Sequence, residues 1–245
     1  MTKTNVRAIL LKLDLKDDRM TTETTATRKG KLTRQAILSR AVQIASREGL
    51  EKLTIGRLAK DLNMSKSGLF SHFGSKESLQ ISTIEMASEI YRNEVIRPAL
   101  RASKGLARLW SICQHFSAYA QQEVFSGGCF FATVTSEYKS CPGLIRDMLA
   151  LRMRDWLSFL TSIIAEAQES GEMNQDIDPS QLAFELQSLL MGTNWFYQLF
   201  EEENIVPTGL EAIRQRLLQL SSPEAHALLD LPEHAVRKEN HEAQQ

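Results

Sequence analysis

The stretch 54–76 constrains this 245-residue chain most, because it predicts two very short helices joined by a tight turn. Thr54 is a good N-cap for the first helix. The apolar side of that helix recurs at helical spacing and consists of Ile55, Leu58, Ala59 and Leu62. Asn63 tolerates the left-handed conformation of a helix end, and Ser65 can cap a second helix that Gly74 ends. This pattern is typical of a helix-turn-helix unit, whose second helix can enter the major groove of DNA.

A longer helix is predicted on each side of this unit. Thr33 can cap the preceding helix, which Gly49 ends. Ser75 can cap the following helix, which we expect to run to about Arg97 because Pro98 cannot continue it. The first three helices share a core that is marginal alone at about 45 residues. We therefore expect them to pack against the fourth.

The helix order, together with the segments TIGRLAKDLNMSK and GLFSHFGSKESL, resembles the DNA-binding domain of TetR-type bacterial transcriptional regulators. The resemblance is specific over roughly residues 33–79 and architectural beyond them. The family usually has a Gly directly after the Lys that matches Lys66, whereas Ser67 stands here and Gly68 follows. A Tyr is usual where Phe70 stands, so a hydroxyl group that often reaches a phosphate is missing. The resemblance implies the family's docking on DNA and leaves the operator sequence open.

The second short helix carries the residues that we expect to contact DNA. Its N-terminus favours anions, and Lys66 can reach a phosphate or a guanine edge. Ser67 can hydrogen bond to bases or backbone, whereas Gly68 would permit a close approach. The expected DNA-binding set is Arg34, Thr54, Ser65, Lys66, Ser67, Gly68, Phe70, His72 and Lys76. For His72 an alternative stays open, in which its ring stacks in the small core.

Charge is distributed unevenly along the chain. Residues 28–76 carry eleven Lys or Arg against three acidic residues, whereas residues 77–245 carry 13 basic and 23 acidic residues. A basic module joined to an acidic body fits phosphate binding at one end. The alternative is a solvated basic surface, which is less favoured because the charge coincides with the helix-turn-helix pattern.

The remaining chain also has helical periodicity, so we predict an all-α fold. Helices are expected over residues 103–124, over the segment CFFATVTSEYK, over residues 143–170, from the Asp178-Pro179 pair, and after Pro207. The predicted parts are a flexible N-terminal arm (1–30), a three-helix DNA-binding domain (31–76), a larger helical domain for effector binding and dimerisation (77–220), and a flexible tail (221–245).

One DNA-binding domain of this size contacts only a few base pairs. Each good contact to a base favours the correct base over a wrong one by about 1–3 kcal/mol. We therefore expect a homodimer on a palindromic operator of double-stranded DNA. The helices within residues 179–220 are the expected dimer interface. The alternative is that these helices only close the core of one chain.

The body is rich in large apolar side chains, and the resemblance implies that it encloses a small apolar or amphipathic effector. The expected lining is Cys113, Phe116, Phe131, Met148, Trp156 and Trp195. Each of these residues also fits an ordinary place in a helical core, which is the commoner use of such side chains.

Other function classes find little support. The sequence contains no GxSxG, HExxH or P-loop motif, so we predict no enzyme activity, no metal and no cofactor. No apolar run reaches the roughly 18 residues that span a membrane. Three cysteines without CxxC spacing indicate a cytoplasmic protein without a disulfide scaffold. A metal or thiol sensor built from Cys129, Cys141 and His115 is a less favoured alternative.

The sequence therefore predicts a TetR-like DNA-binding transcriptional regulator, specifically a repressor that a small molecule releases from its operator. Two alternatives stay open. One is an architectural DNA-binding protein that needs no ligand, and the other is a helical cytosolic enzyme or carrier that uses a pocket in the body.

Overall fold

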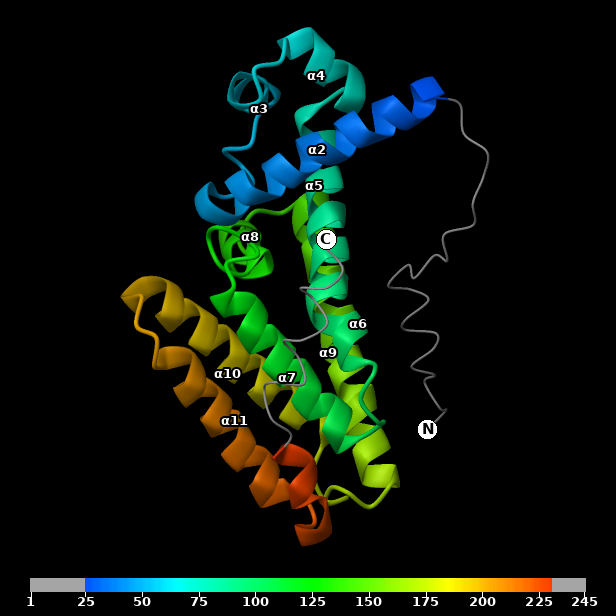
Figure 1. Ribbon diagram of the computed structural model, residues 1–245, viewed down its shortest axis with the longest axis vertical. Helices are drawn as coiled ribbons and strands as arrows, with labels where there is room; N and C mark the ends of the chain where they lie inside the picture. The colour runs from blue at the N-terminus through cyan, green and yellow to red at the C-terminus, as the bar shows by residue number, and fades with distance from the viewer. Residues whose placement is uncertain (1–24, 231–245) are drawn as a thin grey trace. The chain divides into compact units, whose positions relative to one another are not determined.

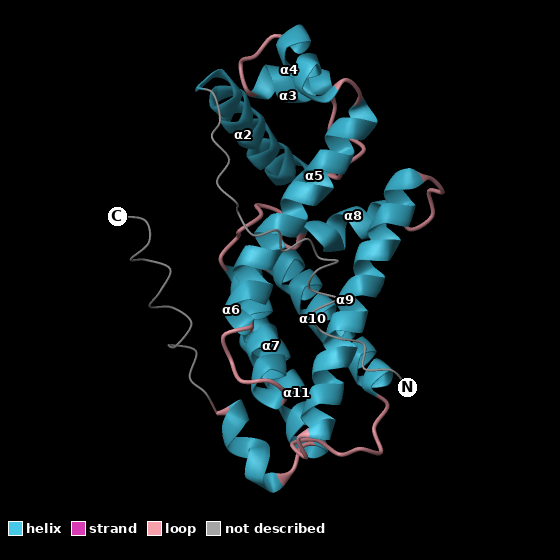
Figure 2. Cartoon of the chain, turned by 90° about the vertical axis from the view of Figure 1, so that its right-hand side faces the viewer, coloured by secondary structure: helices cyan, strands magenta, loops and turns pink. Residues whose placement is uncertain are grey.

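The computed structural model describes residues 25–230, and within them it contains helices and no strands (Figures 1 and 2). The all-α prediction is therefore confirmed. Most of the predicted arm (1–24) and most of the predicted tail (231–245) lie outside the described residues.

The described chain divides into two compact units. One, called the head unit here, comprises residues 25–90 and 123–151, and the other, called the body unit, comprises residues 91–122 and 152–230. These units follow another boundary than the predicted domains, which separate residues 31–76 from residues 77–220. Residues 123–151 group with the DNA-binding helices although they are far from them in the chain.

The head unit contains four consecutive helices from the first part of the described chain, the last of them all but one residue, and one helix from later in the chain. These are α2 (Thr25–Glu48), α3 (Ile55–Asp61), α4 (Lys66–Phe73), α5 (Lys76–Tyr91) and α8 (Phe130–Tyr138). Helix α2 begins eight residues before Thr33, which corrects the predicted cap and the predicted end of the arm at residue 30. The physical reason is that Ala, Arg, Lys and Leu in residues 25–32 all favour helix, and an internal Thr does not oblige a helix to begin there.

The core of the head unit follows the predicted helical stripes. The buried side chains include Ile37, Ala41, Ile44 and Ala45 from α2, Leu58 from α3, Leu69 and Phe73 from α4, and Leu79 from α5. Two ion pairs join α2 to α3, one between Arg40 and Asp61 and one between Glu48 and Arg57. The segment CFFATVTSEYK forms α8 as predicted, and α8 packs against α2.

The body unit is built from η1 (Arg92–Ile96), α6 (Arg97–Ala99), α7 (Leu106–Gln121), most of α9 (Leu144–Glu169), α10 (Pro179–Phe200), α11 (Ile205–Leu220) and η2 (Pro223–Leu229). Helices α10 and α11 run side by side (Figure 1). Asp178 caps α10 as predicted, because its carboxylate accepts a hydrogen bond of 2.8 Å from the Ser180 N–H.

Two predicted helix boundaries and the predicted start of the tail need correction. After Tyr91 the chain makes a π-helical turn, Arg92–Ile96, and the helix continues to Ala99, so Pro98 lies within the helical run and does not end it. Helix α11 begins at Ile205, so Pro207 lies in its first turn, where a missing N–H breaks no hydrogen bond of the helix. The start of the predicted tail forms η2, because Ala225 and Leu229 give it an apolar side that is buried.

Candidate DNA interface

The turn between α3 and α4 is shaped by the side chains that the sequence pointed to. Thr54 Oγ1 accepts a hydrogen bond of 3.1 Å from the Arg57 N–H, and Ser65 Oγ accepts one of 3.0 Å from the Gly68 N–H. Asn63 adopts a positive φ of 53°. The predicted helix-turn-helix is therefore confirmed, and its two caps fix where α3 and α4 begin.

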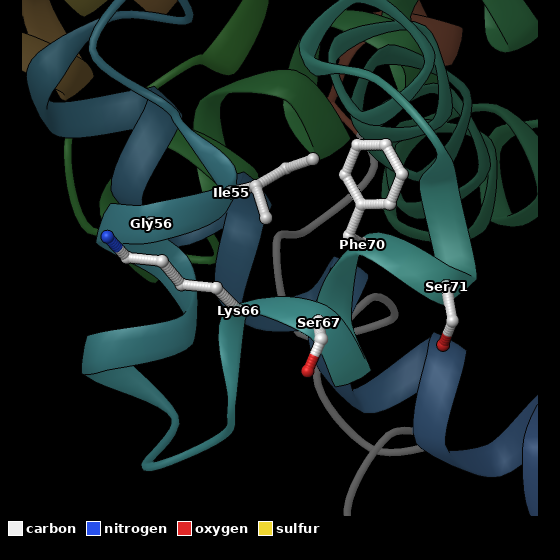
Figure 3. A pocket seen from close by; sticks show the side chains of 6 residues that line it. All are labelled: Ile55, Gly56, Lys66, Ser67, Phe70 and Ser71. Atoms are coloured by element: carbon white, nitrogen blue, oxygen red, sulfur yellow. The ribbon is translucent and has the colours of Figure 1, made fainter.

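Helix α4 has one buried and one exposed side. Leu69 and Phe73 are buried, whereas Lys66, Ser67 and Phe70 are exposed. The exposed side borders an open hollow of about 500 Å³ between α3 and α4 (Figure 3). Its lining consists of Ile55, Gly56, Lys66, Ser67, Phe70 and Ser71. The structure therefore brings three of the predicted DNA-binding side chains together on one surface.

The positive charge of the stretch 28–76 is partly neutralised by internal ion pairs. Its three acidic residues all pair with bases of the same stretch. Lys76 is one of these bases, because its Nζ lies 2.5 Å from a carboxylate oxygen of Glu51. Lys66 forms no ion pair within the described part of the chain. Of these two predicted phosphate contacts, only Lys66 is therefore available without breaking another contact.

Glu51 is held from two directions. Lys76 and the hydroxyl group of Tyr138, which donates a hydrogen bond of 2.9 Å, both favour its charged form and lower its pKa. Burial and the nearby Glu51 carboxylate raise the pKa of Tyr138, which keeps its hydroxyl group protonated as the donor. Lys76 thus reaches DNA only by exchanging Glu51 for a phosphate.

Two other predicted contacts have partners inside the head unit. The guanidinium group of Arg34 lies 4.8 Å from the ring centroid of Phe73 and donates a hydrogen bond of 2.8 Å to Ser82 Oγ. Arg34 is thus held apart from the exposed side of α4. The half-buried ring of His72 lies 6.2 Å from the ring of Phe73, which fits the alternative of stacking in the core.

A contact that the sequence did not predict anchors the corner between α2 and α3. The two carboxylate oxygens of Glu137 accept hydrogen bonds from the Leu50 N–H (2.7 Å) and the Glu51 N–H (3.0 Å). Gly49 adopts a φ of 88° at this corner, and a Cβ atom there would lie 2.8 Å from the same carboxylate. Gly49 itself was the only local signal in the sequence, because a Gly at this position indicates that α2 ends and the chain turns. Nothing local indicates that their acceptor lies 87 residues away.

Further contacts extend this anchor along α2. Thr133 Oγ1 donates a hydrogen bond of 3.0 Å to the Ser46 carbonyl group. The side chain of Gln43 donates to the Val124 carbonyl group and accepts from the Ser126 N–H, both at 2.8 Å. The segment 124–138 therefore holds α2 through side-chain and main-chain hydrogen bonds. We call these contacts, together with those of Glu137, the α2 anchor.

The predicted effector-lining residues do not form one group. Phe116 and Trp156 lie around Tyr91, with ring centroids 6.3 and 5.4 Å from it. Trp195 is 61% exposed on α10, and Phe131 and Met148 belong to the head unit. An effector pocket lined by this set stays a prediction, with Phe116 and Trp156 as its best-supported members.

The cysteines of the sensor alternative differ in exposure, because Cys129 is buried and Cys141 is exposed, and both are free thiols. A third cysteine, Cys113 of α7, is unreactive, since complete burial raises the pKa of its thiol to about 12. Among residues 25–230, no three His, Cys, Asp or Glu side chains are grouped as metal ligands. Within the same residues, no helix is long and apolar enough to cross a membrane.

The capped α3–α4 pair, with its exposed basic side, defines a helix-turn-helix DNA-binding protein. Comparison with known families agrees with this class. Residues 37–81 match the bacterial regulatory proteins of the tetR family, and residues 105–238 match the tetracyclin repressor-like C-terminal domain. The chain therefore belongs to the TetR family of DNA-binding transcriptional regulators.

Individual relatives are distant. The chain is 22% identical over 153 residues to the transcriptional regulator AcuR of Cereibacter sphaeroides, which covers 62% of this chain and 70% of AcuR. A TetR transcriptional regulator from Chloroflexus aurantiacus has a similar structure, with a TM-score of 0.73, 19% identity, and coverage of 79% of this chain and 98% of that chain. AibR, in complex with isovaleryl coenzyme A and operator DNA, has a TM-score of 0.60 and 19% identity, and covers 74% of this chain and 97% of its own. At these identities the two structures show a shared fold.

Proposed function

We propose that the protein is a repressor that binds a palindromic operator as a homodimer and leaves it when a small apolar or amphipathic molecule binds the body unit. The observation that carries this proposal is the exposed side of α4. There Lys66, Ser67 and Phe70 are exposed on a helix whose start is capped by the side chain of Ser65. A short, rigidly capped helix with a basic exposed start fits the major groove.

The roles in DNA binding follow from these positions. Lys66 contacts a phosphate or a guanine edge, and Ser67 hydrogen bonds beside it. Thr54 and Ser65 use their hydroxyl oxygens as caps and therefore act by positioning α3 and α4. Lys76 contacts the backbone after releasing Glu51, which makes its contribution smaller than that of an unpaired lysine.

Dimerisation is proposed through α10, because this helix carries a large exposed apolar face. The exposed side chains are Phe184, Trp195, Phe196, Leu199 and Phe200. Arg216 Nε on α11 donates a hydrogen bond of 2.8 Å to Glu185 on α10, so the two helices are joined beside this face. A second copy of the chain is the proposed partner, because an exposed aromatic patch on one helix is self-complementary about a two-fold axis.

Release by an effector requires a molecule that prefers the DNA-incompetent state. The aromatic group around Tyr91 supplies an apolar environment in the body unit, with Phe116, Tyr119 and Trp156 within 6.3 Å of the Tyr91 ring centroid. AibR, which shares the fold, is known with both isovaleryl coenzyme A and operator DNA. A coupling of about 1–3 kcal/mol between the two sites is enough for a useful switch.

The test compares three lysine variants on a duplex selected from random-sequence DNA by the full chain. Lys66→Ala should weaken binding most, because Lys66 is unpaired and lies on the exposed side of α4. Lys76→Ala should lower the salt dependence by about one unit and change sequence preference little. Lys60→Ala removes a charge from the exposed end of α3 and is the matched control, with a smaller expected effect. Equal binding by all three variants and the unaltered chain would refute the docking.

A further inference from the structure

The hollow between α3 and α4 has an apolar centre and a polar edge. In Figure 3 the ring of Phe70 lies beside the side chain of Ile55, whereas the hydroxyl group of Ser67 points away from both. Ser71 Oγ donates a hydrogen bond of 2.7 Å to the Gly68 carbonyl group, so its polar atom is already engaged. The surface that remains for a ligand is mainly hydrocarbon.

Gly56 keeps this hollow open. A Cβ atom at Gly56 would lie 3.3 Å from Cε of Lys66, so the stem of Lys66 runs directly across the bare backbone of α3. The ammonium group of Lys66 therefore lies over Gly56, at the edge of the hollow and on the side away from the Phe70 ring (Figure 3). An anionic backbone beside an apolar group is the ligand that this arrangement fits.

The exposed ring of Phe70 is otherwise hard to explain on a recognition helix. It is 52% exposed, while the other Phe of α4, Phe73, is buried in the core. A phenyl ring has no hydrogen bond to offer to a base edge. The C5-methyl group of thymine is the one apolar group by which base pairs differ in the major groove. Proteins can recognise it by an apolar contact, for example with Phe.

We propose that the hollow seats the C5-methyl group of one thymine in each operator half-site, with Phe70 and Ile55 as the specificity-determining residues. Lys66, at the edge, contacts the neighbouring phosphate or guanine. The inference rests on the proposed docking of α4 in the major groove and adds the base that Phe70 selects.

The test uses a duplex selected from random-sequence DNA by the full chain. Each thymine is replaced in turn by deoxyuridine, which lacks only the methyl group, and affinity is measured by fluorescence anisotropy at fixed salt. One position per half-site should show weaker binding by about fourfold, the equilibrium equivalent of removing one methyl group from water. The other thymines should show no such loss.

Variants of the head unit then connect that position to the hollow. Phe70→Ala should bind the thymine and deoxyuridine duplexes equally, whereas Phe70→Leu, which keeps an apolar contact, should retain part of the difference. Leu32→Ala truncates another exposed apolar side chain of the head unit (59% exposed) and should retain the full difference. Circular dichroism checks that each variant is folded.

Three results would overturn the inference. If no thymine-to-deoxyuridine replacement weakens binding, Phe70 contacts a sugar or stays exposed to solvent instead. If the difference persists in Phe70→Ala, another residue reads the methyl group. If the unaltered chain binds no duplex, the proposed docking of α4 fails as well, which separates this result from the first two.

Discussion

At the scale of single residues, Glu137 makes the contact that carries most consequence for the head unit. Its carboxylate accepts both backbone N–H groups that follow the turn at Gly49. Hydrogen bonds that are partly exposed to water, as these two are, contribute about 0.5–1.5 kcal/mol each. This corner precedes α3 directly, so Glu137 helps to fix the position from which the helix-turn-helix starts.

Glu137→Ala should lower the free energy of unfolding by about 1–3 kcal/mol, because two amide groups lose their acceptor. Glu137→Gln should lose less, since one carbonyl oxygen remains. Urea denaturation measures both values. Glu203→Ala, at an exposed position after α10, is the control. A Glu137→Ala protein as stable as this control would contradict the role of the anchor.

The pair of Glu51 and Lys76 restrains DNA binding. Glu51→Gln should free the ammonium group of Lys76 and remove a negative charge from its side, so binding should tighten at low salt. The salt dependence should change by well under one unit, because Lys76 contacts a phosphate in both proteins. Adding Lys76→Ala to Glu51→Gln should abolish the gain. A gain that survives in the double variant would show that Lys76 is not the group released.

Acid should weaken the head unit through the same pair. The pKa of Glu51 is lowered, chiefly by its hydrogen bond with Lys76 and then by that with Tyr138. A lowered folded-state pKa stabilises the protein above the ordinary glutamate pKa of about 4.3, and this stability is lost as pH falls through the lowered value. In thermal unfolding below pH 5, the unaltered chain should therefore lose stability more steeply than Glu51→Gln. Parallel curves would exclude this contribution.

At the scale of elements, the short helices were the most predictable part of the chain. Their caps and apolar stripes lie within a few residues of one another, so local chemistry fixes α3 and α4. The π-helical turn after Tyr91 was not predictable, because it has no local sequence signal. Helix α8 was predicted as a helix, but its partner was not, since its hydrogen bonds join residues more than 80 positions apart.

The candidate site was predictable to a similar degree. Lys66 was identified because the Ser65 cap places it at the exposed start of α4, and Phe70 because the family resemblance places an aromatic ring at its position. The pairing of Lys76 with Glu51 and the placement of Arg34 over Phe73 were not, because both depend on how α2 and α5 pack. Sequence spacing indicates which residue types lie near a surface, whereas tertiary packing decides which of them already have partners.

Helix α10 provides the sharpest test at this scale. Leu199→Glu should convert the proposed dimer into monomers, because it buries a charge in an apolar interface. Leu151→Glu is a matched control, since Leu151 is 56% exposed on α9 and Leu199 is 58% exposed on α10. Analytical ultracentrifugation measures the oligomeric state. A dimer that survives Leu199→Glu but not Leu151→Glu would move the interface away from α10.

At the scale of the whole molecule, the two units do not coincide with the two regions matched to the family. The C-terminal family match covers residues 105–238, yet residues 123–151 belong to the head unit. Helices α5 and α9 each contribute residues to both units. The head unit is thus assembled from two separate stretches of the chain.

The α2 anchor has a practical consequence for fusing the helix-turn-helix region of this chain to the ligand-binding domain of another regulator. A fusion made anywhere between residues 76 and 105 would transfer α2 without part of the α2 anchor. Gln43 would lose its partners Val124 and Ser126, and the Leu50 N–H would lose Glu137. The other regulator would then have to supply a carboxylate group next to the turn at Gly49. Hybrid regulators designed from this chain should therefore graft both stretches together, or replace the missing acceptor by design.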